Sequence, residues 1–79
     1  MSNLDRYNKV FIECFSVSPD QLNSEFVYQG ITAWDSIGHM SLISLLENEF
    51  DIMIEMDDVI DFGSYTIGIN ILKKYDVEI

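Results

Sequence analysis

The amino-acid sequence predicts an all-α fold, a small four-helix bundle formed by a single domain over residues 1–79. Two stretches, 4–15 and 36–50, place apolar residues at the three- and four-residue steps of a helix. A convincing pair of β-strands is lacking, because only Ile52-Met53-Ile54 could pair with a strand near the C-terminus. An apolar content of 48% is enough to form one modest core in a chain of 79 residues. Helices packed around that core are therefore expected.

The first helix is predicted from Leu4 to Phe15. Apolar residues recur along it at helical spacing and charged residues fall on the other side, with Ile12 as the exception. Cys14 lies in the apolar stripe, and we interpret it as a small buried hydrophobic residue rather than a reactive thiol.

A long connection follows the first helix. Ser18-Pro19-Asp20 suits the start of a short turn, Gly30 marks another turn, and the remainder up to Trp34 should be mostly loop. The connection has many apolar residues for a loop, and several of them should pack against the helices. These residues are Leu22, Phe26, Val27, Tyr28, Ile31 and Trp34.

Asp35 is expected to cap the second helix. A short carboxylate just before a periodic apolar run accepts hydrogen bonds from the free N–H groups of the first turn. Ser36 then takes the first helical position, where a hydroxyl normally faces solvent. A phosphate ester on Ser36 would lie at the positive end of the helix dipole, so this side chain is a favourable place to carry a phosphate.

The second helix should have two different faces. Leu42, Leu46 and Phe50 repeat at four-residue steps and should face the core, flanked by Ile43 and Leu45. The opposite stripe consists of Ile37, Ser41, Ser44 and Asn48. Ile37 is an apolar residue on this polar face beside Ser36, and together with nearby Met40 it is interpreted as part of a partner-binding surface.

Two shorter helices complete the predicted bundle. The segment from Met56 to Phe62 suits a short third helix with Val59, Ile60 and Phe62 inward, and Gly63-Ser64 supplies a stop and a new cap. The last segment satisfies both strand alternation and helical spacing. We expect a helix, because a partner strand is lacking and Lys73-Lys74 suits a helix C-terminus.

The charge is strongly negative: fourteen acidic and four basic residues give a formal net charge of −10. This balance argues against nucleic-acid or anionic membrane partners and favours basic protein surfaces. Half of the acids form one series without an intervening Lys or Arg: Glu47, Glu49, Asp51, Glu55, Asp57, Asp58 and Asp61. A solvated face would explain the series, but we favour a docking surface. An EF-hand is excluded, since its glycine and its last glutamate are missing.

The sequence also indicates a compartment. The first residues lack the apolar core of a signal peptide, and no run is long enough to span a bilayer. A single cysteine rules out an internal disulfide, which fits a reducing compartment. We therefore expect a monomeric protein of the cytoplasm that does not bind membranes.

The segment around Ser36 carries a resemblance. Asp35-Ser36-Ile37, followed by Met40, Leu42, Ile43, Leu46, Glu47, Glu49 and Phe50, resembles the acyl carrier protein family, in which Asp-Ser-Leu opens a helix. The resemblance covers nearly the whole chain, and the family fold is a small four-helix bundle with a long connection between the first two helices and a short third helix. Ser36 matches the serine that carries the prosthetic group.

The resemblance implies a cofactor and partners. In that family a phosphopantetheinyl transferase uses coenzyme A and magnesium to esterify the serine with 4′-phosphopantetheine, whose thiol carries acyl groups as thioesters. Acyl- or aminoacyl-loading and transfer enzymes with basic docking surfaces would be the other partners. The residues expected at the docking surface are Ile37, Met40, Glu47, Asp57, Asp58 and Asp61. An acyl chain could be sheltered between the second and third helices, where apolar surface is offered by Met40, Met53, Ile54, Val59 and Ile60.

The sequence departs from the common pattern of fatty-acid synthesis carriers. Such carriers usually read Asp/Glu-Leu-Gly-x-Asp-Ser-Leu and have acids early in the helix, whereas this chain reads Ile31-Thr32-Ala33-Trp34-Asp35-Ser36 and then lacks early acids. We therefore expect a specialised carrier that serves a dedicated acyl- or aminoacyl-transfer pathway. Two alternatives are an aminoacyl or peptidyl carrier protein and an unmodified acidic interaction module in which Asp35-Ser36 is only a helix cap.

Catalysis by the chain itself is not expected. His39 is the only histidine, and a pair formed with Ser36 would lack an oxyanion hole and an orienting acid in proven geometry. His39 is interpreted as a surface residue at the helix start that could touch the prosthetic arm or a partner. One histidine and one cysteine cannot supply a zinc site, so no metal is predicted.

Overall fold

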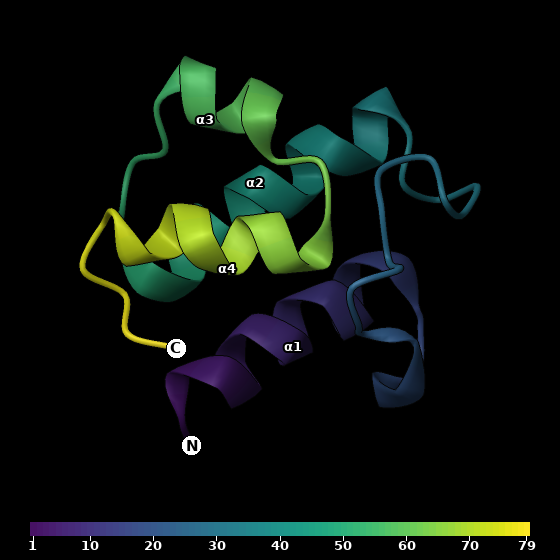
Figure 1. Cartoon of the computed structure of the whole chain (residues 1–79), viewed down its shortest axis with the longest axis horizontal. Helices are drawn as coiled ribbons and strands as arrows, with labels where there is room; N and C mark the ends of the chain where they lie inside the picture. Colours follow the sequence, from purple (N-terminus) through teal and green to yellow (C-terminus); the bar gives the residue numbers. More distant parts are fainter.

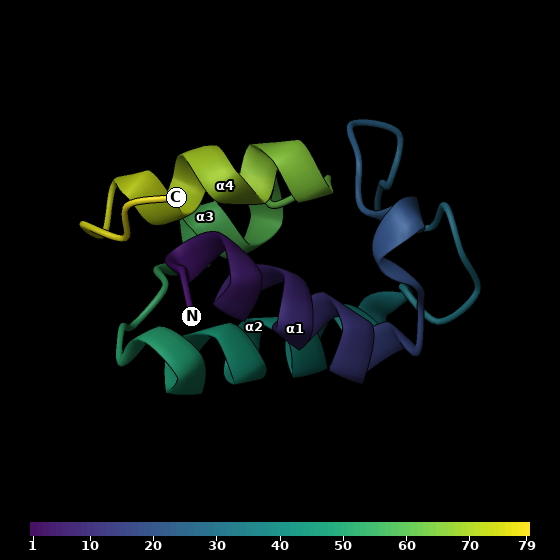
Figure 2. The same ribbon diagram turned by 90° about the horizontal axis from the view of Figure 1, so that it is seen from below.

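The computed structural model describes residues 1–79 and contains four α-helices and no β-strand. The elements are α1 (Asn3–Phe15), the 3-10 helix η1 (Pro19–Gln21), α2 (Ser36–Phe50), α3 (Met56–Asp61) and α4 (Tyr65–Lys73). Figure 1 shows α4 in front of α2, with α1 along one edge and α3 along the opposite edge. Figure 2 shows α2 and α4 on opposite sides of the molecule. The predicted all-α bundle with a long first connection and a short third helix is confirmed.

The first helix begins and ends with local signals. Ser2 Oγ accepts a hydrogen bond from the Asp5 N–H at 3.1 Å, and the Asp5 carboxylate accepts one from the Ser2 N–H. This reciprocal pair satisfies two N–H groups that the helix itself cannot. Ser16 ends the helix in a left-handed conformation with φ 55°. The buried face consists of Tyr7, Val10, Phe11 and Phe15, as the apolar spacing predicted.

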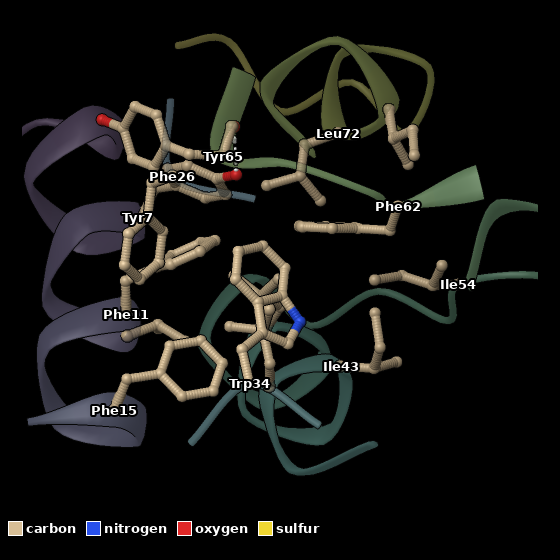
Figure 3. Packing of buried hydrophobic residues seen from close by; sticks show 14 of the residues in the cluster. Tyr7, Phe11, Phe15, Phe26, Trp34, Ile43, Ile54, Phe62, Tyr65 and Leu72 are labelled. Carbon is tan, nitrogen blue, oxygen red and sulfur yellow. Dashed lines mark hydrogen bonds between the residues drawn. The ribbon is translucent and has the colours of Figure 1, made fainter. Parts of the chain in front are cut away.

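Aromatic side chains fill the centre of the bundle (Figure 3). Phe11 of α1 lies with its ring centroid 5.6 Å from that of Trp34, in an edge-to-face arrangement, and 5.8 Å from that of Phe26. Both partners come from the connection between α1 and α2, and Trp34 is fully buried. The predicted anchoring of this connection is therefore confirmed. The buried Trp34 anchors the chain two residues before Ser36.

The C-terminal segment is a helix, as expected. Ser64 Oγ accepts a hydrogen bond from the Ile67 N–H at 3.0 Å and caps α4. The apolar run finds no partner strand, since the only β-type pairing is an isolated bridge between Val27 and Ser64. Lys73 is the last residue of α4 and Lys74 is its C-cap.

Three orientations differ from the prediction. Leu45 is exposed, because α2 buries the stripe through Leu42, Ile43 and Leu46. Ile60 was expected to face inward, but its exposed fraction is 72% because α3 turns Val59 to the core. Cys14 is only half-buried, and this burial raises the pKa of its thiol.

No helix combines the length and the apolar character needed to cross a membrane.

Candidate functional site

Ser36 lies at the exposed start of α2, as predicted. Asp35 is the N-cap, and its carboxylate accepts a hydrogen bond from the Gly38 N–H at 2.8 Å. Ser36 is the first residue of the helix, and its hydroxyl oxygen lies 3.4 Å from the Tyr28 hydroxyl. An anionic group on this oxygen would be close to the first-turn N–H groups and to the positive end of the helix dipole.

An apolar groove of about 340 Å³ lies between α2 and α3. Its lining residues are Tyr28, His39, Met40, Met56, Val59, Ile60, Phe62 and Gly63. Tyr28 connects the groove to Ser36, since it is a lining residue and its hydroxyl oxygen lies 3.4 Å from that of the serine. The structure therefore places an exposed hydroxyl beside a concave apolar surface.

The groove partly matches the predicted shelter for an acyl chain. Met40, Val59 and Ile60 line it as expected. Ile54 instead packs in the core, and Met53 has an exposed fraction of 84% and is not among the lining residues. Sequence reasoning missed that Tyr28, His39, Met56, Phe62 and Gly63 would line the groove, because these residues come together only when the connection, α2 and the α3–α4 corner pack.

His39 occupies a different position from the predicted surface site. The side chain is half-buried in the groove wall, where it contacts aromatic rings of the connection and of the segment after α3. Its Nδ1 accepts a hydrogen bond from Trp34 Nε1–H at 2.9 Å, and its Nε2 lies 2.8 Å from Val59 O. Both ring nitrogens are thus engaged by residues other than Ser36.

The apolar part of the expected docking surface is exposed. Ile37 has an exposed fraction of 79% next to Ser36, and Met40 is exposed one turn further along α2. Met56 and Ile60 of α3 are also exposed, although the sequence did not point to them as surface residues. Met40, Met56 and Ile60 also line the groove, whereas Ile37 is not among its lining residues.

The acidic residues expected at a docking surface differ in their exposure. Asp57 and Asp61 are exposed on α3, and neither takes part in an ion pair within the chain. Glu47 is half-buried, and its carboxylate accepts a hydrogen bond from the Ile54 N–H at 2.9 Å. Asp58 was expected to bind partners, but its exposed fraction is only 7%.

Asp58 instead joins α3 to the end of α4. Its carboxylate pairs with Lys74 Nζ at 2.5 Å and accepts a hydrogen bond from the Tyr75 hydroxyl at 2.5 Å. The Tyr75 hydroxyl also accepts a hydrogen bond from the Glu55 N–H. The hydrogen bonds from Lys74 and Tyr75 lower the pKa of the Asp58 carboxyl. This carboxylate therefore has a structural role. The role depends on contacts with Lys74 and Tyr75, which follow Asp58 in the sequence by 16 and 17 positions, respectively.

The other clusters of side chains are weaker candidates for a functional site. A second groove, also of about 340 Å³, lies at the C-terminal tail and is lined by Lys73, Asp76, Val77, Glu78 and Ile79, away from the residues around Ser36. No group of three or more His, Cys, Asp or Glu side chains is arranged to hold a metal ion. No family model, no curated protein and no solved structure matches the chain.

Proposed function

We propose that this chain is a carrier protein that holds acyl groups as thioesters on a 4′-phosphopantetheine arm attached to Ser36. The observation that carries the proposal is the exposed Ser36 hydroxyl at the first position of a capped helix, in contact with Tyr28 at the edge of an apolar groove. The resemblance to the acyl carrier protein family over the Asp35-Ser36-Ile37 segment supports the same function. The chain would act as a substrate carrier and not as an enzyme.

The residues around Ser36 fit the proposed arm. The phosphodiester would meet the N–H groups of the first turn of α2, and the Ser36 side chain leaves room for it because it faces solvent. When attached, the arm supplies a terminal thiol that forms thioesters. Asp35 caps the helix start by accepting a hydrogen bond from the Gly38 N–H.

The groove favours an acyl cargo over an aminoacyl cargo. Its walls are mostly apolar side chains, and Met40 and Met56 are flexible enough to adjust to an inserted chain. A small polar aminoacyl group would gain little from this surface. The expected specialised role in a dedicated acyl-transfer pathway remains part of the proposal, as does a cytoplasmic location.

The surface around Ser36 is suited to enzymes with basic docking surfaces. Asp57 and Asp61 are exposed without an ion-pair partner, while Ile37 and Met40 add apolar contact area. Opposite charges increase the rate of encounter, and salt weakens this effect. The rate of transfer from a loaded carrier should therefore fall as ionic strength rises.

The direct test is modification of the purified protein. Incubation with coenzyme A, magnesium and a broad-specificity phosphopantetheinyl transferase should add the mass of one phosphopantetheine group. Ser36→Ala should abolish this addition, whereas Ser41→Ala, which changes another exposed serine of α2, should leave it intact. An unmodified wild-type protein, in a reaction where a known carrier is modified, would contradict the proposal.

Two further measurements separate the alternatives. Intact-mass analysis of the protein from its native host would support an unmodified interaction module if the arm is consistently absent. Acyl-ligase assays with fatty acids and adenylation-domain assays with amino acids would distinguish the two kinds of carrier. Efficient loading and elongation by fatty-acid-synthase enzymes would remove the reason for a specialised role.

A further inference from the structure

His39 joins three segments of the chain at the wall of the groove. Its Nδ1 accepts a hydrogen bond from Trp34, the last buried residue of the connection, and its Nε2 bonds to the Val59 carbonyl in α3. The ring also lies within aromatic contact of Tyr28 and Phe62, with centroid separations of 5.3 and 6.0 Å. The connection, α2 and α3 therefore meet at one imidazole ring.

The two hydrogen-bond partners determine where the proton on the ring lies. An indole N–H can only donate, so Nδ1 must present a lone pair to Trp34. A carbonyl can only accept, so Nε2 must carry the hydrogen that is donated to Val59 O. Only the neutral ring with this tautomer satisfies both partners, because a protonated ring turns a second N–H toward the indole N–H.

The bond to Val59 matters because α3 is short. The helix has six residues, and Val59 is one of the last four, whose carbonyls lack a partner inside the helix. Met56, Val59 and Ile60 of α3 all line the groove. A shift of α3 relative to Trp34 and α2 would therefore change the shape of the groove.

We propose that His39 is a positioning residue whose neutral ring ties α3 to Trp34 and thereby holds the groove beside Ser36 in its observed shape. Protonation of the ring breaks the bond from Trp34, so that α3 and His39 are no longer tied to Trp34, while the Nε2–H bond to the Val59 carbonyl is kept. The biological role of this regulation rests on the proposed carrier function. The hydrogen bonds of His39, however, are present in the unmodified chain. It can therefore be tested without the prosthetic arm.

The charged groups near the ring are engaged elsewhere or exposed. Asp35 caps α2, and Asp58 is bound by Lys74 and Tyr75. The remaining acids of α3, Asp57 and Asp61, are exposed, as are Asp20 and Glu25 of the connection. In α2, Glu47 accepts a hydrogen bond from the Ile54 N–H and Glu49 pairs with Arg6. The titratable group in contact with the ring is the Tyr28 phenol, and no hydrogen bond joins any of these groups to the imidazole. The wild type and the His39 variants share all of these groups. A comparison of the wild type with the variants therefore isolates the effect of the imidazole ring.

The first experiment measures binding of the neutral apolar probe N-phenyl-1-naphthylamine by fluorescence between about pH 7.5 and about pH 5.5, the range in which histidine side chains change charge. Wild-type affinity should fall by about fivefold at the acid end, the effect of losing one hydrogen bond. His39→Gln should bind equally well at both ends. In glutamine, the acceptor Oε1 and the donor Nε2 flank Cδ, as Nδ1 and Nε2 of histidine flank Cε1. The glutamine amide carries no charge at either pH. His39→Leu should bind weakly throughout.

The second experiment uses the wild type alone. The chain has one tryptophan and one histidine, so NMR gives one indole N–H signal and one set of imidazole signals. The Trp34 indole signal should shift with the same pH midpoint as the His39 ring. An indole signal that stays constant while the ring titrates would overturn the proposal.

Other outcomes also count against the role of His39. These are equal pH profiles for wild type and His39→Gln, wild-type affinity in His39→Leu, and absence of probe binding to the wild type at about pH 7.5. If Ser36 cannot be modified but both experiments give the expected results, the carrier function fails while the positioning role of His39 stands.

Discussion

Replacing Gly38 with alanine should destabilise the protein, although alanine is the better helix former. Gly38 is the third residue of α2, and its N–H donates to the Asp35 carboxylate. A Cβ added at this position would lie 2.0 Å from Ala33 O and 3.3 Å from a ring carbon of Phe15. The backbone of the connection passes so close to α2 that only glycine fits.

Two opposing effects determine how much stability the Gly38→Ala variant loses. Alanine in place of glycine stabilises a helix interior by about 1 kcal/mol. Inserting a carbon into a packed site costs typically about 1–3 kcal/mol, and the upper end applies because the atom in contact is backbone. Ala33 can move only together with its neighbour Trp34, which is fully buried. The net loss should be about 2 kcal/mol, or a decrease in Tm of roughly 10 °C for a domain of this size.

The assay is thermal and urea unfolding followed by far-UV circular dichroism. The matched control is Ser41→Ala, an exposed position on the same helix, which should equal or slightly exceed the wild type in stability because alanine has the higher helix propensity. If Gly38→Ala is as stable as the wild type or more stable, the close approach of Ala33 to α2 does not constrain this site and the reasoning is refuted.

Two other predictions concern carboxylates. Asp35→Ala should lower the free energy of unfolding by about 1 kcal/mol in urea, and Asp35→Asn should lose less because asparagine also caps helices; equal stability of Asp35→Ala and wild type would count against the cap. The pKa of Asp58 is lower in the folded state, so its stabilisation is present above about pH 4, the usual carboxyl pKa, and is lost as pH falls through the folded pKa. Asp58→Asn should therefore show a flatter decline in stability from neutral to acid pH, and parallel curves would contradict this.

Local signals allowed the sequence to predict most elements. The Ser64 cap and the Lys73-Lys74 pair correctly indicated a C-terminal helix, despite the β-branched residues within it. Asp35 and Ser36 were also placed correctly, because capping depends on residues three positions apart. The apolar periodicity was a weaker signal for the third helix, because a helix of six residues contains too few turns to define its buried face. Ile60 was therefore assigned to the wrong face.

The chemistry around the groove could not be predicted in the same way. His39 looked like a surface residue at a helix start, and its bond to Val59 spans 20 positions in the chain. Asp58 looked like one acid among seven, and only the return of Lys74 and Tyr75 separates it from the exposed Asp57. No spacing rule brings such residues together, since each contact depends on how two helices pack.

By itself, the sequence determined four helices, the caps of the second and fourth, and an exposed serine at the start of the second helix. Hydrogen bonds within a turn and the burial of apolar stripes are local or periodic effects. The tertiary structure alone decided that Tyr28, His39 and Phe62 would converge on an apolar groove beside that serine. It also decided which acids remain exposed. These outcomes follow from the packing of a long aromatic connection against the helices, and that packing joins residues whose separation in the sequence carries no signal.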